Sequence, residues 1–95
     1  MESDTIVRIF AVASGHVQGV GFRYFVQTNA LKYLLAGWVK NMEDGTVTME
    51  IQGPEVNVNQ LLSMIKKGNM FCRVDHLEVR DIDIYEENDG FKIIR

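Results

Sequence analysis

Residues 6–34 read IVRIFAVASGHVQGVGFRYFVQTNALKYL, and this stretch decides the architecture expected for the chain. Residues 6–14 are rich in Val, Ile and Phe, with apolar side chains at both parities, which predicts a buried central strand. Residues 22–34 carry apolar side chains at helical spacing, interrupted only by Asn29, which predicts a helix. The glycine-rich segment between them indicates a loop that leads from a strand directly into the start of a helix.

Two strands joined by a tight turn are expected after this helix. Residues 38–42 and 46–52 flank the sequence Glu-Asp-Gly, a pattern typical of a β-hairpin. In the second strand apolar residues occupy the odd-numbered positions from Val47 onward, so one of its faces is expected in the core. A second helix is predicted between Pro54 and Gly68, because proline is favoured at a helix start and glycine just past its end.

The last third of the sequence predicts a long strand and a short one. Residues 74–85 form the long strand, but their apolar residues change from odd to even positions, which predicts a bulge near Arg80 and Asp81. Residues 91–94 form the short strand. The order strand, helix, strand, strand, helix, strand, with one short extra strand, favours a ferredoxin-like α+β sandwich. In that βαββαβ fold two helices lie on one face of an antiparallel sheet.

Size and composition limit the class of protein. The 95 residues allow one domain, 1–95, in which we expect residues 1–5 to be flexible. Hydrophobic residues make up 46% and charged residues 24%, which is ordinary for a globular protein. The single cysteine, Cys72, excludes an internal disulfide. Without a secretory signal or a long apolar run, a cytoplasmic protein that binds no membrane is expected.

The loop at residues 15–21 is the first candidate for chemistry. Its glycines let several backbone N–H groups turn toward one centre, and the following helix start adds partial positive charge. Arg23 lies just inside that helix, where a cation is unfavourable unless an anion is bound nearby. No Lys-Ser/Thr pair follows, so the loop is not a Walker motif. Glycine spacing alone leaves an ordinary turn and an anion site both open.

Two segments together carry a family resemblance. The loop and helix start, GHVQGVGFR at residues 15–23, closely resembles the first signature of the acylphosphatase family. The segment GWVKN at residues 37–41, continued by Gly45, Val47 and Gly53, resembles the second. The resemblance covers nearly the whole chain and implies the ferredoxin-like fold that the order of elements also predicts.

The resemblance further implies which residues act. Arg23 would bind the substrate phosphate, and Asn41 would position the attacking water. Backbone amides of the loop would complete the phosphate site, with contributions expected from Gln18, Gly19, Val20, Gly21 and Phe22. The sequence departs from the family where Leu34 replaces the usual glycine at the end of the first helix. Leu34 is therefore expected either to adopt a strained left-handed conformation or to continue the helix.

These residues fit the hydrolysis of acyl phosphates to carboxylate and orthophosphate. Phosphoryl transfer passes through a loose transition state that a protein can stabilise by positioning and charge. A carboxylate leaving group, with a pKa of roughly 4, needs no general acid. We therefore expect a metal-free enzyme without a cofactor, acting on a small acyl phosphate as a monomer and inhibited by phosphate or sulfate.

Two other functions remain to be weighed. One is a non-catalytic phosphate or carbamoyl-phosphate-type binding module, because this domain type also resembles the first part of larger hydrogenase-maturation proteins. The other is single-stranded RNA binding, which would require exposed aromatic residues on the sheet and a basic surface. The polar positions of residues 46–52 carry no aromatic, Trp38 is expected in the core, and the net charge is -3. No nucleic-acid partner is therefore expected.

Overall fold

The computed structural model describes residues 5–86 and 90–95 of the chain. Seven elements follow one another: β1 (Ile6–His16), α1 (Phe22–Lys32), β2 (Ala36–Asn41), β3 (Val47–Pro54), α2 (Glu55–Lys67), β4 (Arg73–Ile82) and β5 (Phe91–Ile94). We expect residues 1–5 to be flexible, but of these the structure describes only Thr5. The Thr5 carbonyl accepts a hydrogen bond from the N–H of Glu55 at 3.0 Å.

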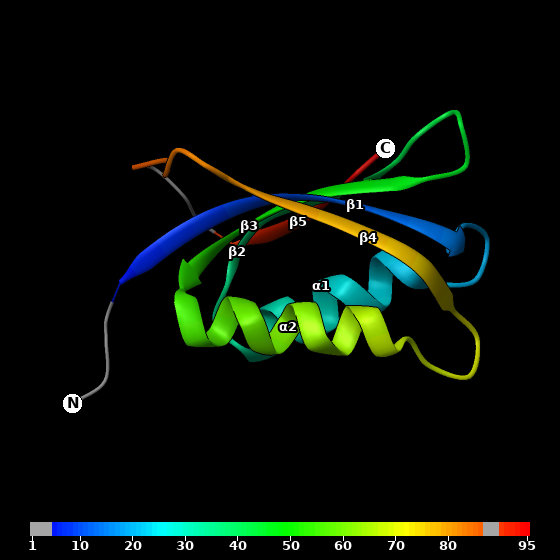
Figure 1. The fold of residues 1–95 in the computed structure, drawn as a ribbon, viewed down its shortest axis with the longest axis horizontal. Coiled ribbons are helices and arrows are strands. Elements are labelled where there is room, and N and C mark those ends of the chain that lie inside the picture. Colours follow the sequence, from blue (N-terminus) through cyan, green and yellow to red (C-terminus); the bar gives the residue numbers. More distant parts are fainter. Residues whose placement is uncertain (1–4, 87–89) are drawn as a thin grey trace.

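The strands form one sheet with the order β4-β1-β3-β2-β5. The four longer strands pair antiparallel, whereas β5 lies parallel to β2 at the edge, so the sheet is mixed. Both helices cover the same face of this sheet (Figure 1). The prediction of a ferredoxin-like α+β sandwich is confirmed, with β5 as the addition to its four-stranded core.

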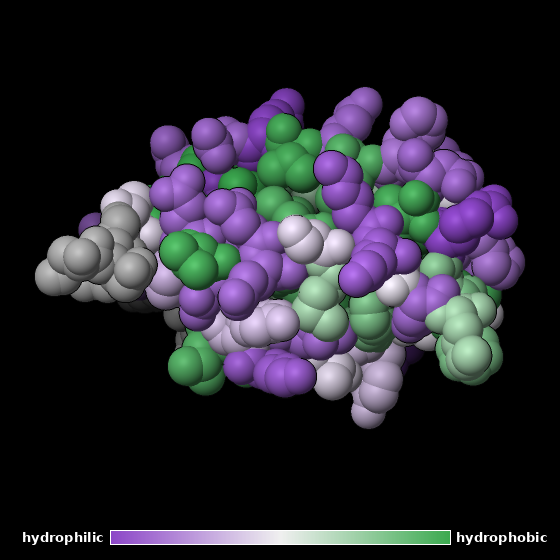
Figure 2. Space-filling view, turned by 60° about the horizontal axis from the view of Figure 1, so that its bottom comes forward, coloured by the Kyte–Doolittle hydropathy of each residue, from purple (hydrophilic) through white to green (hydrophobic). Residues whose placement is uncertain are grey.

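The pairing of the strands determines which side chains meet the helices. Even-numbered residues pair with even-numbered residues in all strands, up to the irregularity after Ser14. Odd-numbered residues therefore face the helices and even-numbered residues the other side, called the open face below. The core lies between sheet and helices and includes Ile9, Ala11, Ala13, Val39, Val47, Met49 and Ile51 from the strands and Phe22, Val26, Ala30, Val58, Leu61 and Ile65 from the helices. On the outer side of the helices, apolar and hydrophilic residues are interspersed (Figure 2).

The bulge predicted near Arg80 and Asp81 is wrong. Pairing between β1 and β4 runs without interruption from Arg8 opposite Ile82 to Ser14 opposite His76, and its register shifts only between Ser14 and Gly15. The change of apolar parity has another cause. Leu77 packs against the core on the helix side, whereas Ile82 lies on the open face, so the apolar residues of β4 are divided between the two faces of one uninterrupted strand.

The first helix ends before Leu34, which takes a left-handed conformation with φ 60°. The Leu34 N–H donates to the Leu31 carbonyl at 3.1 Å, and the Leu35 N–H donates to the Ala30 carbonyl at 2.8 Å. These two bonds define a Schellman motif, the helix ending in which glycine is preferred at the position that Leu34 occupies. Of the two expectations for Leu34, the strained conformation is therefore the one observed.

Candidate active site

A cavity of about 250 Å³ opens where the loop after β1 meets the start of α1 and the ends of β2 and β5. It is lined by Val17, Gly19, Gly21, Phe22, Arg23, Tyr24, Asn41, Ile93 and Arg95. Five of the seven residues expected at the site lie in this lining, whereas Gln18 and Val20 do not. Segments that are far apart in the sequence are thus brought together around one small space.

The loop backbone presents the start of α1 to the cavity. Gly19 and Gly21 have φ values of 74° and 80°, which L-residues with side chains rarely adopt. Gly21 is the residue before the helix, which has no side-chain cap and no acidic residue in its first turn. The first N–H groups of a helix have no partner within it, and here no described side chain neutralises them. This end of α1 is therefore suited to an anion.

Gln18 supports the loop through its side chain, although the sequence predicted only a backbone contribution. Its Nε2 atom donates hydrogen bonds to the Met42 carbonyl at 2.8 Å and to the Thr46 carbonyl at 2.9 Å. Both acceptors belong to the turn between β2 and β3, directly after Asn41. Gln18 thus ties the loop to the strand end that carries Asn41 and fixes their separation.

Arg23 and Asn41 both line the cavity with unused hydrogen-bonding capacity. The half-buried side chain of Arg23 forms no hydrogen bond or ion pair with any residue that the structure describes. The Oδ1 atom of Asn41 is buried and has no hydrogen-bond partner. A buried acceptor without a partner is uncommon, because leaving one costs about 1 to 3 kcal/mol. The lining thus includes an unpaired guanidinium and a residue whose acceptor atom is unpaired.

Arg95 is a lining residue that sequence reasoning missed. It lies one residue beyond β5, which pairs with β2 through contacts distant in the sequence. No local pattern around Arg95 indicates this position, so only the pairing of β5 reveals it. With Arg23 it gives the cavity two guanidinium groups, and no acidic side chain is among the residues that line it. The charged side chains among the lining residues are therefore all cationic, despite the net charge of -3.

Two titratable groups stabilise the segments around the cavity. Hydrogen bonds from the Thr46 hydroxyl and N–H lower the pKa of Asp44, which keeps this turn carboxylate ionised. Burial raises the pKa of the Cys72 thiol. The Cys72 Sγ donates to the Val20 carbonyl at 3.7 Å, so the neutral thiol supports the loop from behind. Neither group lines the cavity.

Within the described ranges, no cluster of three or more His, Cys, Asp or Glu side chains is arranged to hold a metal ion. The helices of this part of the chain are also too short or too polar to cross a membrane.

The ferredoxin-like sandwich, with a cavity at its first strand–loop–helix junction that is lined by two arginines, defines a small α+β domain suited to bind an anion. The family model for acylphosphatase matches residues 9–93, and the chain belongs to that family. It is 47% identical over 87 residues to an acylphosphatase of Geobacillus thermodenitrificans, covering 92% of this chain and 93% of that protein. An acylphosphatase of Bacillus subtilis is 42% identical over 83 residues, covering 87% and 91% of the two chains.

Solved structures give the same result. The crystal structure of an acylphosphatase from Bacillus subtilis matches with a TM-score of 0.89 and 38% identity, covering 96% of this chain and all of that one. Full-length HypF, in a phosphate- and nucleotide-bound form, matches with a TM-score of 0.88 and 32% identity. That match covers 99% of this chain but only 12% of HypF, so the two share one domain.

Proposed function

We propose that this chain hydrolyses the carboxyl–phosphate bond of acyl phosphates, without a metal ion, to a carboxylate and orthophosphate. Membership of the acylphosphatase family supports the reaction class. The observation that carries the mechanism is that Asn41, whose buried Oδ1 has no hydrogen-bond partner, lines the same cavity as Arg23 and the start of α1. Donors for a phosphate and a residue with an unused acceptor for a water are thus brought together.

The phosphate binds first, through charge and hydrogen bonds. Its oxygens accept from the N–H groups of residues 18–22 and from the planar guanidinium of Arg23. Because α1 has no acidic residue in its first turn, nothing there competes with the anion for these donors. Arg95 adds a second positive group at the rim and favours the charge that spreads over the phosphoryl oxygens in the transition state.

Asn41 then orients the attacking water. Its Oδ1 accepts a hydrogen bond from the water, which turns a lone pair of the water oxygen toward phosphorus. The new bond from this oxygen to phosphorus forms as the bond from phosphorus to the acyl oxygen breaks. The proton of the water passes to a phosphate oxygen, and the carboxylate leaves with the bonding electrons. The lining has no His, Asp or Glu, and such a leaving group requires none.

A non-catalytic phosphate or carbamoyl-phosphate-type binding module is the alternative, and the match to one domain of HypF keeps it open. The Asn41 acceptor favours catalysis. A site that only binds phosphate benefits from donors, whereas a carbonyl oxygen beside a phosphate is repulsive unless a water lies between them. As further parts of the proposal, the enzyme is a cytoplasmic monomer, and phosphate and sulfate inhibit it competitively.

Phosphate release from benzoyl phosphate in the presence of EDTA tests this proposal. We expect saturable turnover that EDTA leaves unchanged, together with far slower hydrolysis of p-nitrophenyl phosphate, whose leaving group is more basic. Activity that EDTA abolishes and a divalent ion restores would exclude the metal-free mechanism. Phosphate binding without any turnover would instead identify a binding module.

A further inference from the structure

The open face of the sheet carries a row of charged and aromatic side chains that the proposed hydrolysis does not use. Strand pairing aligns Arg80 on β4 with Phe10 on β1, Phe10 with Glu50 on β3, Glu50 with Trp38 on β2, and Trp38 with Lys92 on β5. All five therefore lie side by side across the sheet, on the side away from the helices. Phe10 and Trp38 are both partly exposed.

This arrangement corrects the expectation that Trp38 belongs to the core, because Trp38 is partly exposed on the open face. The polar positions of residues 46–52 on β3 carry no aromatic, as stated above. The neighbouring strands β1 and β2 supply Phe10 and Trp38 on either side of β3. With neighbouring strands roughly 4.8 Å apart, the two rings stand about 10 Å apart.

The charge of the row is positive, although the chain as a whole is acidic. Glu50 accepts a hydrogen bond from the Arg8 Nε at 2.8 Å, so its charge is already compensated. Arg80, Lys92 and the neighbouring Lys40 form no ion pair with a described residue. These three free cations contrast with the net charge of -3 of the chain, which places the negative excess elsewhere.

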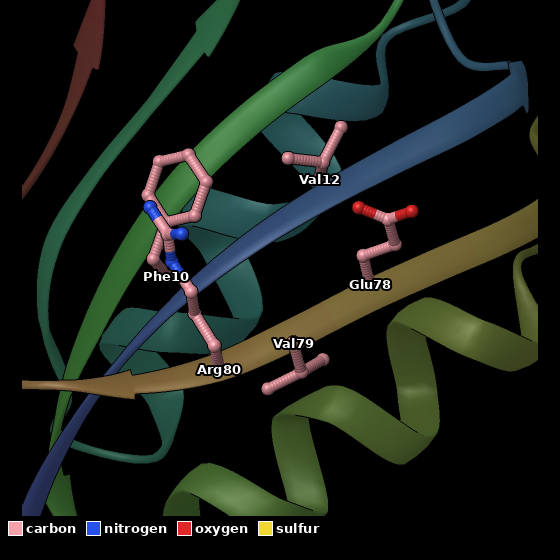
Figure 3. Close-up of a pocket in the computed structure, with 5 residues that line it drawn as sticks. All are labelled: Phe10, Val12, Glu78, Val79 and Arg80. Atoms are coloured by element: carbon pink, nitrogen blue, oxygen red, sulfur yellow. The ribbon is translucent and has the colours of Figure 1, made fainter.

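A shallow cavity of about 390 Å³ lies at one end of the row (Figure 3). Its lining includes Phe10, Val12 and Arg80, and the Arg80 guanidinium lies over the Phe10 ring at 4.9 Å. Figure 3 shows the carboxylate of Glu78 on the side of Val12, away from the stacked pair. The surface thus offers a cation over an aromatic ring and an apolar floor, and its lining includes one carboxylate, Glu78, which forms no ion pair with a described residue.

We propose that the open face binds single-stranded nucleic acid. Exposed bases stack on aromatic rings and on guanidinium planes, and nearby cations contact the phosphates. Arg80 over Phe10 provides one stacking position and Trp38 the other, with Lys40 and Lys92 near the second. Because these positions are about 10 Å apart and stacked bases only about 3.4 Å, the bound bases must be splayed. The acidic remainder of the chain makes the binding weak and sensitive to salt.

Anisotropy of fluorescein-labelled ten-nucleotide oligouridylate and oligothymidylate, titrated with the full chain at low salt, tests this proposal. We expect dissociation constants of roughly 10⁻⁵ to 10⁻⁴ M and a slope of log affinity against log salt of about -1.4, since the phosphate contacts of Lys40 and Lys92 contribute about -0.7 each. Trp38 is the only tryptophan, so its fluorescence reports locally and should be quenched over the same range.

Variants that each remove one charge distinguish binding at the open face from general electrostatic attraction to the chain. Arg80→Gln should weaken binding roughly fivefold or more, and Glu78→Gln should strengthen it, with acyl phosphate hydrolysis unchanged in both. Lys66→Gln, which removes the same charge from α2, should change the affinity far less. No quenching of Trp38, equal losses in Arg80→Gln and Lys66→Gln, or displacement by millimolar phosphate at constant ionic strength would each overturn the proposal. So would equal or tighter binding of hexaglutamate or of phosphatidylglycerol vesicles.

Discussion

Replacing Leu34 by glycine should stabilise this fold. Leu34 is the left-handed residue of the Schellman motif that ends α1, and its side chain is 84% exposed. A residue with a Cβ atom in this conformation costs about 1 to 2 kcal/mol, which glycine avoids. Glycine also gives the unfolded chain more freedom, which costs about 0.4 to 1 kcal/mol. We therefore expect a net gain of roughly 0.5 to 1 kcal/mol in the free energy of unfolding.

Urea unfolding followed by Trp38 fluorescence measures this gain. A rise of the midpoint with an unchanged slope is expected, together with an increase in melting temperature of about 2 to 8 °C. Leu34→Ala is the matched control, because it removes the side chain and keeps the strain, and it should change little. Turnover should be unaffected, since Leu34 lies about 16 Å along α1 from the cavity. A lower midpoint for Leu34→Gly, or equal midpoints for both variants, would refute the strain argument.

Three further predictions concern the cavity and its supports. Phosphate or sulfate should raise the melting temperature by binding only the folded state, and a hundredfold excess over the dissociation constant should add about 2.7 kcal/mol to the free energy of unfolding. No shift of the melting temperature relative to chloride at equal ionic strength would count against an anion site. Gln18→Ala should lower kcat by roughly tenfold and the unfolding free energy by about 1 to 2 kcal/mol, and Gln18→Glu should not restore either, because a carboxylate cannot donate to the carbonyls of Met42 and Thr46. Because the pKa of Asp44 is lowered on folding, its contribution to stability should persist above about pH 4 and disappear as the pH falls further; a difference in unfolding free energy between the wild type and Asp44→Asn that stays constant down to pH 2.5 would contradict this.

Local patterns in the sequence were sufficient to predict most elements and the glycine-rich loop before α1. Glycine spacing and the helix start are properties of neighbouring residues, so they predict the junction that the structure contains. The bounds of β5 were also correct. The sequence Asn88-Asp89-Gly90 before β5 also predicts a turn, but of these residues the structure describes only Gly90.

Features of the site that depend on pairing between distant segments could not be predicted from local patterns. Gln18 binds carbonyls about 25 residues away, and Arg95 reaches the cavity only because β5 pairs with β2. The position of Trp38 likewise follows from its alignment with Glu50 and Lys92. Alternation of apolar and polar residues along one strand shows that the strand has two faces, but not which face the helices cover. In β4 the change of apolar parity led to the prediction of a bulge that the structure does not contain.

The most direct test of the proposed mechanism compares Arg23 and Asn41 by two quantities, kcat with benzoyl phosphate and the inhibition constant of orthophosphate. Phosphate is charged in both the bound state and the transition state, so Arg23→Ala should weaken phosphate binding and reduce turnover by about 10² to 10³ or more. Arg23→Lys should not restore activity, because an ammonium lacks the planar pair of donors.

Asn41→Ala should instead lower kcat by on the order of 10² while the inhibition constant of phosphate stays within a few-fold of the wild type, since Oδ1 acts on the water. Circular dichroism must first show that each variant is folded. A folded Asn41→Ala that loses phosphate affinity as severely as Arg23→Ala, or that keeps full turnover, would contradict the assignment of the water to Asn41.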